Sequence, residues 1–427
     1  MFYLIETKNQ LNQLELKLSA SLTRYLEFIQ GNDNTHPALA EIIAIYLEVD
    51  GEDFIIPLNH LECINQDRDL IFSLLERYDF CVLDKKSSLH AAPQLSYTDI
   101  QHSIPSLDKH TTQTHIWYYR KFPHTKVNKM IPIGKHLERC KQKSHDIFQE
   151  YRGEVNTYFD KILLPVLYKL EKNALKFNAK FDEYFEPKNK KFSIKDDHIY
   201  GWYNPYTTTG RPVNNFNGIN FVGLKHDNGE RDTFEPDNDF FVEMDYDGYH
   251  PRLIGDIVDY QFEGNVHNTL AEIYFKSKNI TPQQYKESKT LTFKQIYGGI
   301  DKANLYHPFF KKTQDFINII WEEFNKKGEV KCGSYTIRKK DHPKIHSQKL
   351  FNYYIQATET ETNIRKIKII QDYLKIKQTR LVLYIYDAFI FDVAKSDGKQ
   401  ILIDLQTILS DKFPVKLKSG THYGALS

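Results

Sequence analysis

The acidic residue Asp387 lies inside a run, Leu381–Val393, where almost every neighbour is apolar. Such a run predicts buried β-structure with Asp387 at or near a turn. An unpaired carboxylate in an apolar surrounding is costly, so the fold has to compensate its charge. A divalent metal ion shared with a second carboxylate would do so. The alternative is that Asp387 is simply a polar residue at a hairpin turn.

A second candidate carboxylate, Asp245, follows the strand-like run Asp239–Met244. The segment Pro251–Val258 behind it begins with proline, which favours the first turn of a helix. The sequence therefore delivers a carboxylate at the end of a predicted strand and just before a predicted helix.

Between these two carboxylates, Lys289, Phe293 and Tyr297 recur at every fourth position. On a helix each step drifts by about 40° and rises about 6 Å, so the three side chains share one face. A cation, an apolar ring and a phenol in a row suit the phosphates, sugar and base of a nucleoside triphosphate. A stripe of core residues would explain the same spacing.

Composition excludes several classes of protein. The chain has 427 residues, 41% hydrophobic and 26% charged, which is typical of globular proteins. The formal charge of +1 gives no bulk attraction to nucleic acid, so such a partner would need local patches. No apolar run of about 18 residues is present, and we expect a soluble cytoplasmic protein. The four cysteines form no close pair, which argues against a disulfide framework and a zinc site.

The N-terminal part predicts a β-hairpin, with strands at Ile42–Leu47 and Phe54–Pro57. Helical periodicity follows over Asp67–Tyr78, and Lys85–Lys126 has the polar, weakly periodic character of a loop-rich connection.

The stretch Lys135–Phe177 is predicted to be strongly helical, with one apolar stripe and a solvent-facing side. The stripe contains Tyr158, Ile162, Pro165, Leu167, Leu170 and Leu175, and the solvent side contains Lys161, Lys169, Glu171 and Lys172. The lysine-rich segment Glu186–Lys191 then predicts a boundary or a flexible linker.

The order of the three chemical motifs resembles that of the family A DNA polymerases, the DNA polymerase I-like group. The motif residues are Asp245 and Tyr246, then Lys289, Phe293, Tyr297 and Gly298, then Asp387. Flanking segments extend the resemblance: Thr208–Arg211 with Asn220, the pair Asn352 and Gln356, and the helix Leu163–Asn173. The match covers about residues 155–427, and Glu41–His60 is similar, more weakly, to the strand pair of the family's proofreading exonuclease.

The resemblance implies a template-dependent DNA polymerase that takes primer-template DNA and deoxynucleoside triphosphates. Asp245 and Asp387 would hold two Mg²⁺ ions, or Mn²⁺, with the backbone carbonyl of Tyr246 as a further ligand, and Lys289 would contact the triphosphate and donate a proton. The residues implied at the nucleotide are Lys289, Phe293, Tyr297, His250, Gly248 and Lys286. Those implied at the DNA are Arg211, Asn220, Asn352, Gln356, Tyr386 and Gly298.

The implied fold is α+β, a right-hand polymerase with an antiparallel palm sheet, helical fingers and a vestigial thumb, behind an N-terminal α/β exonuclease-like domain. The exonuclease-like domain would span residues 1–150 and the polymerase domain 151–427. Within the latter, the reduced thumb would occupy about 155–210, the palm 211–258 and 341–427, and the fingers 259–340.

Several positions depart from the family pattern. Where the exonuclease has metal-binding carboxylates, this chain has Tyr25-Leu26-Glu27 and Lys86-Ser87-Ser88, so we predict a degenerate domain without nuclease activity. Only residues 178–210 remain for a thumb, which predicts low processivity and leaves room for a partner protein that acts as a clamp. Lysines in this interval could contact phosphates instead: Lys180, Lys188, Lys190, Lys191 and Lys195.

Other departures concern the site itself. His250 stands where the family commonly has a glutamate that blocks a ribose 2′-hydroxyl. Ala388 stands where the family has a secondary carboxylate. Tyr285 stands where the family has an arginine, and the neighbouring Lys286 could make the triphosphate contact instead. Two alternatives therefore stay open: a polymerase with relaxed sugar selection, and a polymerase-like protein that binds DNA or a replication partner without catalysis. Asp247, Asp256 and Asp392 are expected to be solvated or structural, and the compact form suggests a viral, for example bacteriophage, replication enzyme.

Overall fold

The computed structural model forms two compact units. The N-terminal unit comprises Met1–Tyr206 and Val213–Glu235, and the C-terminal unit comprises Thr207–Pro212 and Pro236–Ser427. The structure describes residues 2–31, 36–101, 128–150, 153, 155–185, 192–205, 207–214, 219–225 and 228–426. Each unit is described by itself.

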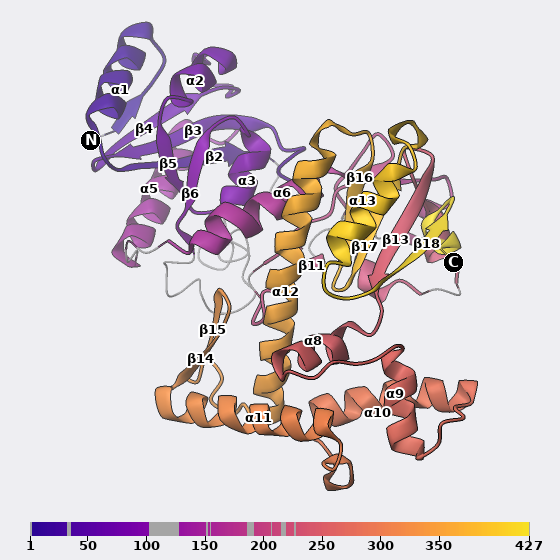
Figure 1. Ribbon diagram of the computed structural model, residues 1–427. Coiled ribbons are helices and arrows are strands. Elements are labelled where there is room, and N and C mark those ends of the chain that lie inside the picture. The colour runs from indigo at the N-terminus through magenta and orange to yellow at the C-terminus, as the bar shows by residue number, and fades with distance from the viewer. Residues whose placement is uncertain are drawn as a thin grey trace. The chain divides into compact units, whose positions relative to one another are not determined.

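A six-stranded sheet in the order β1-β4-β3-β2-β5-β6 forms the framework of the N-terminal unit (Figure 1). Its strands are β1 (Phe2–Leu4), β2 (Arg24–Gln30), β3 (Ile42–Val49), β4 (Glu52–Pro57), β5 (Asp79–Val82) and β6 (Ser96–Asp99). Strands β2, β3 and β4 are antiparallel, and β1, β5 and β6 pair with their neighbours in parallel. The predicted hairpin is confirmed, and its two-residue turn is Asp50-Gly51, both with positive φ, as a type I′ turn requires.

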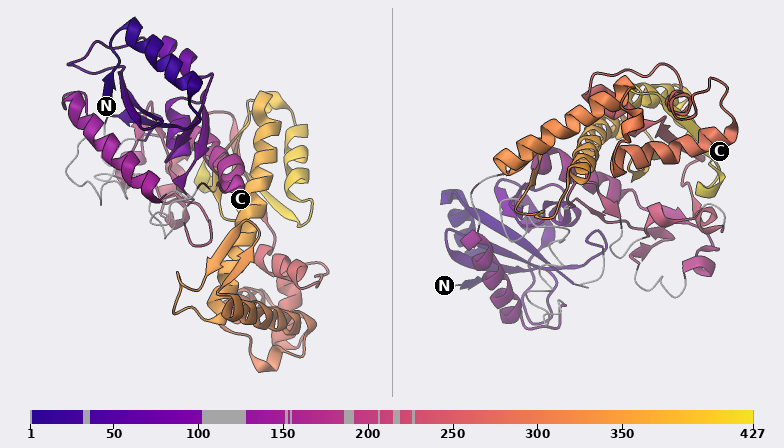
Figure 2. Two further views of the ribbon diagram at one scale, coloured as in Figure 1. Left: turned by 90° about the vertical axis from the view of Figure 1, so that its left-hand side faces the viewer. Right: turned by 90° about the horizontal axis from the view of Figure 1, so that it is seen from below.

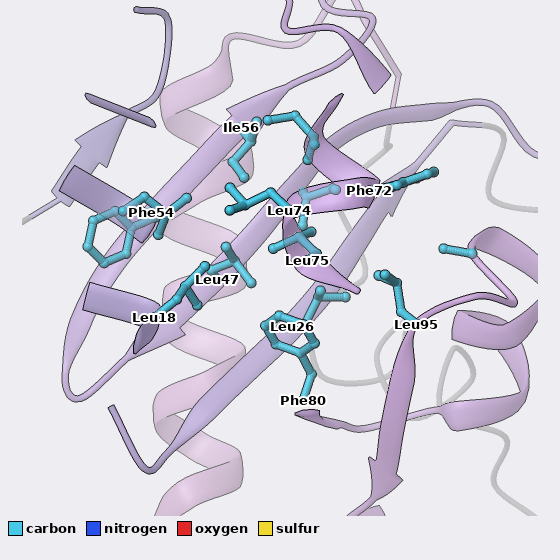
Figure 3. Close-up of a cluster of buried hydrophobic side chains, with 14 of the residues drawn as sticks. Leu18, Leu26, Leu47, Phe54, Ile56, Phe72, Leu74, Leu75, Phe80 and Leu95 are labelled. Atoms are coloured by element: carbon cyan, nitrogen blue, oxygen red, sulfur yellow. The ribbon is translucent and has the colours of Figure 1, made fainter. Parts of the chain in front are cut away.

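Alternation along these strands gives the sheet two apolar faces. Helices α1 (Lys8–Ala20) and α2 (Arg68–Leu75) cover one face, where Leu18, Leu47, Phe54 and Leu75 meet in one core cluster (Figure 3). On the other face a separate cluster joins strand residues to α5 (Ile133–Glu150). The predicted helix at Asp67–Tyr78 is confirmed as α2, and Asp67 caps it by accepting a hydrogen bond from the Leu70 N–H at 2.8 Å.

The expected loop after Lys85 is wrong in its first part, because α3 (Lys85–Ala91) and β6 lie there. Asp84 caps α3, and the helix is too short to show periodicity in the sequence. The rest of that predicted loop, residues 102–127, lies outside the described residues.

The prediction that Lys135–Phe177 is strongly helical is confirmed for most of its described residues, but its last residues form a strand. The segment contains α5, a π-helical turn η2 (Phe159–Leu163), α6 (Leu164–Lys172) and strand β7 (Leu175–Phe177). Pro165 lies in the first turn of α6, where its missing N–H is tolerated. Glu171, expected on the solvent side, is only 2% exposed.

The rest of the N-terminal unit is built of short elements. A small sheet has the order β12-β7-β9-β8, and β10 pairs with β11. The elements are α7 (Phe181–Phe185), β8 (Ile194–Lys195), β9 (His198–Ile199), β10 (Tyr203–Asn204), β11 (Val213–Asn214), η4 (Phe221–Gly223), η5 (Glu230–Thr233) and β12 (Phe234–Glu235). Stacked phenylalanines, including Phe177 on Phe181, fill the space between them. The predicted linker Glu186–Lys191 lies outside the described residues.

An antiparallel sheet in the order β16-β17-β13-β18 forms the centre of the C-terminal unit. Its strands are β13 (Phe240–Tyr246), β16 (Arg380–Ile385), β17 (Ala388–Val393) and β18 (Val415–Gly420). Helices α12 (Ser347–Tyr373) and α13 (Gln400–Leu409) run side by side along one face of it (Figures 1 and 2). Tyr246 points toward these helices, since its hydroxyl donates to the Leu409 carbonyl at 3.1 Å.

A second group of helices contains α8 (Tyr249–Ile257), α9 (Val266–Phe275), α10 (Pro282–Gly298) and α11 (Pro308–Lys327). A hairpin of β14 (Glu329–Cys332) and β15 (Tyr335–Arg338) follows α11. The remaining short helices are η6 (Lys302–Asn304), η7 (Leu374–Ile376), η8 (Lys395–Asp397) and η9 (Tyr423–Ala425). In the described ranges, no helix has both the length and the apolar character needed to cross a bilayer.

The predicted α+β class is confirmed. The division into compact units falls between residues 207 and 236, so the described residues after 150 up to 205 pack with the N-terminal unit. The functional boundary at residue 150 and the palm, fingers and thumb assignments stay predictions.

Candidate active site

A cleft of about 360 Å³ lies in the C-terminal unit, where the ends of β13 and the β16–β17 turn meet α8 and α10. Most of the residues predicted from the sequence line it. The lining consists of Arg211, Asp245, Tyr246, Asp247, Gly248, Tyr249, His250, Pro251, His267, Lys289, Phe293, Glu359, Tyr386, Asp387 and Lys416.

The two predicted carboxylates come together through strand pairing. Asp245 pairs in register with Ala388, the residue after Asp387, so both aspartates lie at the same end of the sheet. Because Tyr246 faces helices α12 and α13, the alternation of a strand turns Asp245 to the opposite face. The prediction that Asp245 lies at the end of a strand is confirmed, although the strand extends past the predicted Met244 and ends at Tyr246. The prediction that Asp387 lies in a hairpin turn is also confirmed.

The turn that carries Asp387 has an unusual backbone. Tyr386 has φ of +57°, in the left-handed region that non-glycine residues rarely occupy. The side-chain amide of Asn363 donates to the Tyr386 carbonyl at 2.8 Å, and the Arg211 guanidinium lies 4.4 Å from the centre of the Tyr386 ring. These two contacts hold Asp387 in a strained but defined position.

The two aspartates repel each other. Burial, and then the charge of Asp387, raises the pKa of Asp245 to about 7. Burial, and then Glu359, also raises the pKa of Asp387, while His250 and Arg211 oppose the rise. Since both pKa values are raised, the charged form of each carboxylate is disfavoured, and a cation bound between the two would be stabilising.

Two lysines on β18 accompany this pair, and sequence reasoning missed both. Lys416 lies opposite Asp245 in the register and its ammonium is 2.5 Å from Asp247, while Lys418 is 2.8 Å from Glu243. The two lysines are two residues apart, so they lie on the same face of the edge strand β18. Nothing in their local sequence indicates that β18 pairs with β13, which lies far away in the chain.

Helix α10 presents the predicted row to the cleft. Its buried residues are Ser288, Thr292, Gln295 and Ile296, so the row is not the core stripe that the spacing allowed. Lys289 and Phe293 line the cleft, and the Phe293 ring is 43% exposed and stacked on Tyr297 with centroids 6.2 Å apart.

The neighbours of this row differ in position. The Lys289 ammonium lies 4.8 Å from the ring centre of Tyr285, which stands where the family has arginine. Lys286 is exposed on α10 and is not among the residues that line the cleft, and Gly298 is the exposed last residue of the helix.

Below the row lies a polar network that sequence reasoning missed in part. The Tyr297 hydroxyl is 2.6 Å from Nδ1 of His250, and Nη2 of Arg211 is 3.1 Å from Nε2 of the same ring. Nε of Arg211 donates to Oε2 of Glu359 at 2.8 Å. Burial by itself raises the pKa of Glu359, but His250 and Arg211 outweigh it and lower that pKa overall.

The remaining predicted contacts lie at the edge of the site. The Gln356 side-chain amide donates to Oδ1 of Asn352 at 2.8 Å on α12, and Thr209 donates to Gln356 at 3.3 Å. Gly248 starts α8 with φ of +65°, and a Cβ there would lie 3.2 Å from Cβ of Val266. Asn220 belongs to the N-terminal unit, where it is exposed and precedes η4.

A second polar cluster lies inside the N-terminal unit around Glu171. Among the described residues, His36, His90 and Glu171 are the one group of three side chains spaced closely enough to bind a metal ion. Nδ1 of His36 accepts the Ala38 N–H at 3.2 Å, however, which places the proton of that ring on Nε2, toward Glu171. Lys86 also donates to Glu171, so donors surround one carboxylate and the cluster is not suited to a cation.

Glu27, the carboxylate nearest to the position expected for a nuclease ligand, is also paired with cations. Oε1 of Glu27 on β2 lies 2.9 Å from the Lys143 ammonium and 3.9 Å from the Arg139 guanidinium, both on α5. The carboxylate is therefore neutralised by its own unit.

Comparison with known proteins finds a solved structure with a similar fold. No protein-family model and no curated protein matches the chain. Among solved structures, the chain is similar to the POL domain of Pol1 from M. smegmatis, which was solved in complex with a DNA primer-template and dNTP. The match covers 100% of both chains with a TM-score of 0.76 and 12% sequence identity. At this identity the likeness shows a shared polymerase-domain fold.

Proposed function

We propose that this chain is a template-dependent DNA polymerase that adds deoxynucleotides to a primer 3′ end. The observation that carries the proposal is the convergence of Asp245 and Asp387 with Lys289 and Phe293 in one cleft. More than 40 residues separate each of these motifs from the next along the chain. The similarity of the fold to that of a polymerase domain also supports a polymerase function.

The site fits divalent metal ions. Asp245 and Asp387 are two partly buried carboxylates. Burial raises the pKa of both, the charge of Asp387 adds to the rise at Asp245 and the charge of Glu359 adds to the rise at Asp387. Mg²⁺ prefers such oxygen ligands. We assign these two side chains, with the Tyr246 carbonyl, as the ligands. When bound, the ions would lower the pKa of the primer 3′-hydroxyl and neutralise the leaving pyrophosphate.

The side chains of the chain itself bind and orient the nucleotide. Lys289, on the cleft-facing side of α10, would contact the triphosphate and hold a proton near the leaving pyrophosphate. The exposed ring of Phe293 would pack on the sugar, and Tyr297 behind it would lie near the templating base. Arg211, Tyr386, Asn352 and Gln356 would contact template or primer.

We also propose that the N-terminal unit lacks nuclease activity. The neutralised carboxylate of Glu27 and the buried Lys86 support this, since hydrolysis of a phosphodiester by two metal ions needs clustered free carboxylates. Weak retention of DNA and a partner that acts as a clamp remain part of the proposal.

A direct test is extension of a labelled primer on a short template with Mg²⁺ and four deoxynucleotides, with Asp387→Ala and a reaction without template as controls. We expect template-directed extension that falls at least a thousandfold in the variant, about 4 kcal/mol of barrier. Intact DNA binding without extension by the wild-type chain would instead identify a polymerase-like binding protein.

Relaxed sugar selection is a second candidate, favoured by one observation. His250 takes the place of a carboxylate and lines the cleft next to Phe293, with ring centroids 6.2 Å apart. Parallel extension with ribonucleotides measures the selectivity directly, and equal rates for both sugars would establish this candidate.

A further inference from the structure

The polar network below the cleft contains one acidic residue, Glu359, that none of the three motifs includes. It lies on α12 and is 1% exposed. Its Oε2 accepts hydrogen bonds from the Arg211 guanidinium and lies 3.4 Å from Nε2 of His250. Its Oε1 has no hydrogen-bond partner in the described structure. A buried carboxylate is retained at a cost, so a specific role at this position is expected.

Glu359 acts on the cleft through Arg211 and His250. Arg211 can only donate hydrogen bonds, and its Nη2 reaches both Glu359 and the His250 ring. The other ring nitrogen of His250 is bonded to Tyr297, so the imidazole is fixed from both sides. The Tyr386 ring lies 4.4 Å from the same guanidinium, and Glu359 is the carboxylate that accepts its hydrogen bonds. Without the charge of Glu359, the guanidinium would lose these hydrogen bonds and be held less firmly against the imidazole.

The imidazole in turn contacts the aromatic row of α10. His250 meets Phe293 edge to face at 6.2 Å and Tyr297 at 5.8 Å, and its side chain is 14% exposed, at the wall of the cleft. Three helices, α12, α8 and α10, are therefore joined through Glu359, His250 and Tyr297.

We infer that Glu359 is a positioning residue that fixes the His250 ring and thereby sets the sugar selectivity of the cleft. This rests on the proposed polymerase function and deepens it. A ring held at both nitrogens forms a rigid wall beside the sugar, whereas a ring released from Arg211 can rotate and admit a 2′-hydroxyl. Glu359 borders the cleft but is only 1% exposed, so we assign it no direct contact with the nucleotide.

The kinetic test compares Glu359→Gln with the wild-type chain in single-nucleotide incorporation, using matched deoxy- and ribonucleoside triphosphates. We expect the ratio of kcat/KM for the two sugars to fall at least fivefold. The charge of Glu359 also acts on Asp387, but that effect is common to both sugars and cancels in the ratio. In a His250→Ala background, Glu359→Gln should not change this ratio further, because the residue that it positions is gone. An unchanged ratio, or effects that add, would overturn the inference. Asp372→Asn, an exposed position on the same helix, is the matched control.

A second measurement does not depend on activity. In protein labelled with ¹⁵N at its histidines, the side-chain resonance of His250, identified by its loss in His250→Gln, should shift in Glu359→Gln and stay in place in Asp372→Asn. A shift in a chain that incorporates neither nucleotide would disprove the proposed function and leave the positioning role standing. A stationary resonance in a well-folded Glu359→Gln variant would disprove the positioning role even if the polymerase activity is present.

Discussion

The ammonium of Lys86 is hydrogen-bonded to the carboxylate of Glu171 in the interior of the N-terminal unit, with side chains 2% and 0% exposed. The pair joins α3 to α6, and the Trp202 ring lies against the same ammonium at 3.9 Å. A second pair, Lys85 and Asp160, joins α3 to the adjoining η2 with a separation of 2.9 Å. Two consecutive buried lysines thus anchor α3, a helix of only seven residues, to neighbouring segments through ion pairs.

Removal of one partner should be more harmful than removal of both. Glu171→Gln leaves the Lys86 ammonium buried without a counter-charge, and we expect a loss of about 3–5 kcal/mol in the free energy of unfolding. The double variant Lys86→Met with Glu171→Leu should lose less than either single variant. Urea denaturation followed by circular dichroism measures this. Glu52→Gln, in the exposed pair with Lys17, is the control and should have little effect.

Acid should destabilise the N-terminal unit before its carboxylates titrate in the unfolded chain. Burial lowers the pKa of both His36 and His90 to about 3. The unfolded chain takes up protons on these rings near pH 6.5 and the folded unit does not, so stability falls as the pH drops from about 6.5 toward 3. The raised pKa of Glu171 acts in the opposite direction and offsets part of the loss.

The measurement is urea denaturation of the wild-type chain and of His36→Gln with His90→Gln at pH 7, 6 and 5. The stability of the wild type should decline across this range, and that of the double variant should decline less steeply. Parallel curves for the two proteins would contradict the assignment.

Two aspartates on the β16–β17 hairpin, the partly buried Asp387 and the buried Asp392, should respond in opposite ways to conversion to asparagine. Asp387→Asn removes a charge that repels Asp245 and should raise the stability without metal by about 1 kcal/mol, while stabilisation by added Mg²⁺ is lost. Asp392→Asn should destabilise by about 1–3 kcal/mol, because Asp392 accepts from the Asn238 N–H at 3.0 Å and from Arg380 at 2.6 Å. Thermal denaturation with and without Mg²⁺ distinguishes the two, and a loss of stability in both variants would count against the repulsion.

Gly210 should not tolerate a side chain. Its φ is +69°, and a Cβ there would lie 2.2 Å from the Tyr335 ring, so Gly210→Ala should cost about 2 kcal/mol or more and disturb Arg211 beside it. Gly328→Ala is the matched control: φ is +77°, ψ is 0° and no atom lies within 4 Å of an added Cβ, which leaves only the backbone cost of about 1 kcal/mol. Equal melting temperatures for the two variants would show that the ring gives way.

The residues that could be predicted from the sequence are those whose neighbours along the chain define their surroundings. An aspartate in an apolar hairpin, an aspartate at a strand end and a row at helical spacing each carry their own signal, and the structure brings Asp387, Asp245 and Lys289 into one cleft. The missed residues depend on distant partners. Glu171 looked like a solvent-facing helix residue because its partner, Lys86, lies 85 positions away.

Glu359 had a local signal that was available but weak. It follows Gln356 by three residues and precedes Asn363 by four, which places the three on one side of a helix. The surrounding run of threonines and glutamates is equally typical of an exposed helix, so only the packing of α12 against Arg211 and the β16–β17 turn separates Glu359 from its neighbour Glu361, which pairs with Arg365.

Asn363 ties together two parts of the site that are far apart in the chain. Its side-chain oxygen accepts the Tyr249 hydroxyl at 2.9 Å, and its nitrogen donates to the Tyr386 carbonyl at 2.8 Å. A single side-chain amide is thus hydrogen-bonded to both the first and the third motif. A shift of either motif relative to α12 would break one of the two hydrogen bonds to Asn363. Loss of this one amide would therefore loosen the first and the third motif at the same time, although neither metal-binding carboxylate is altered.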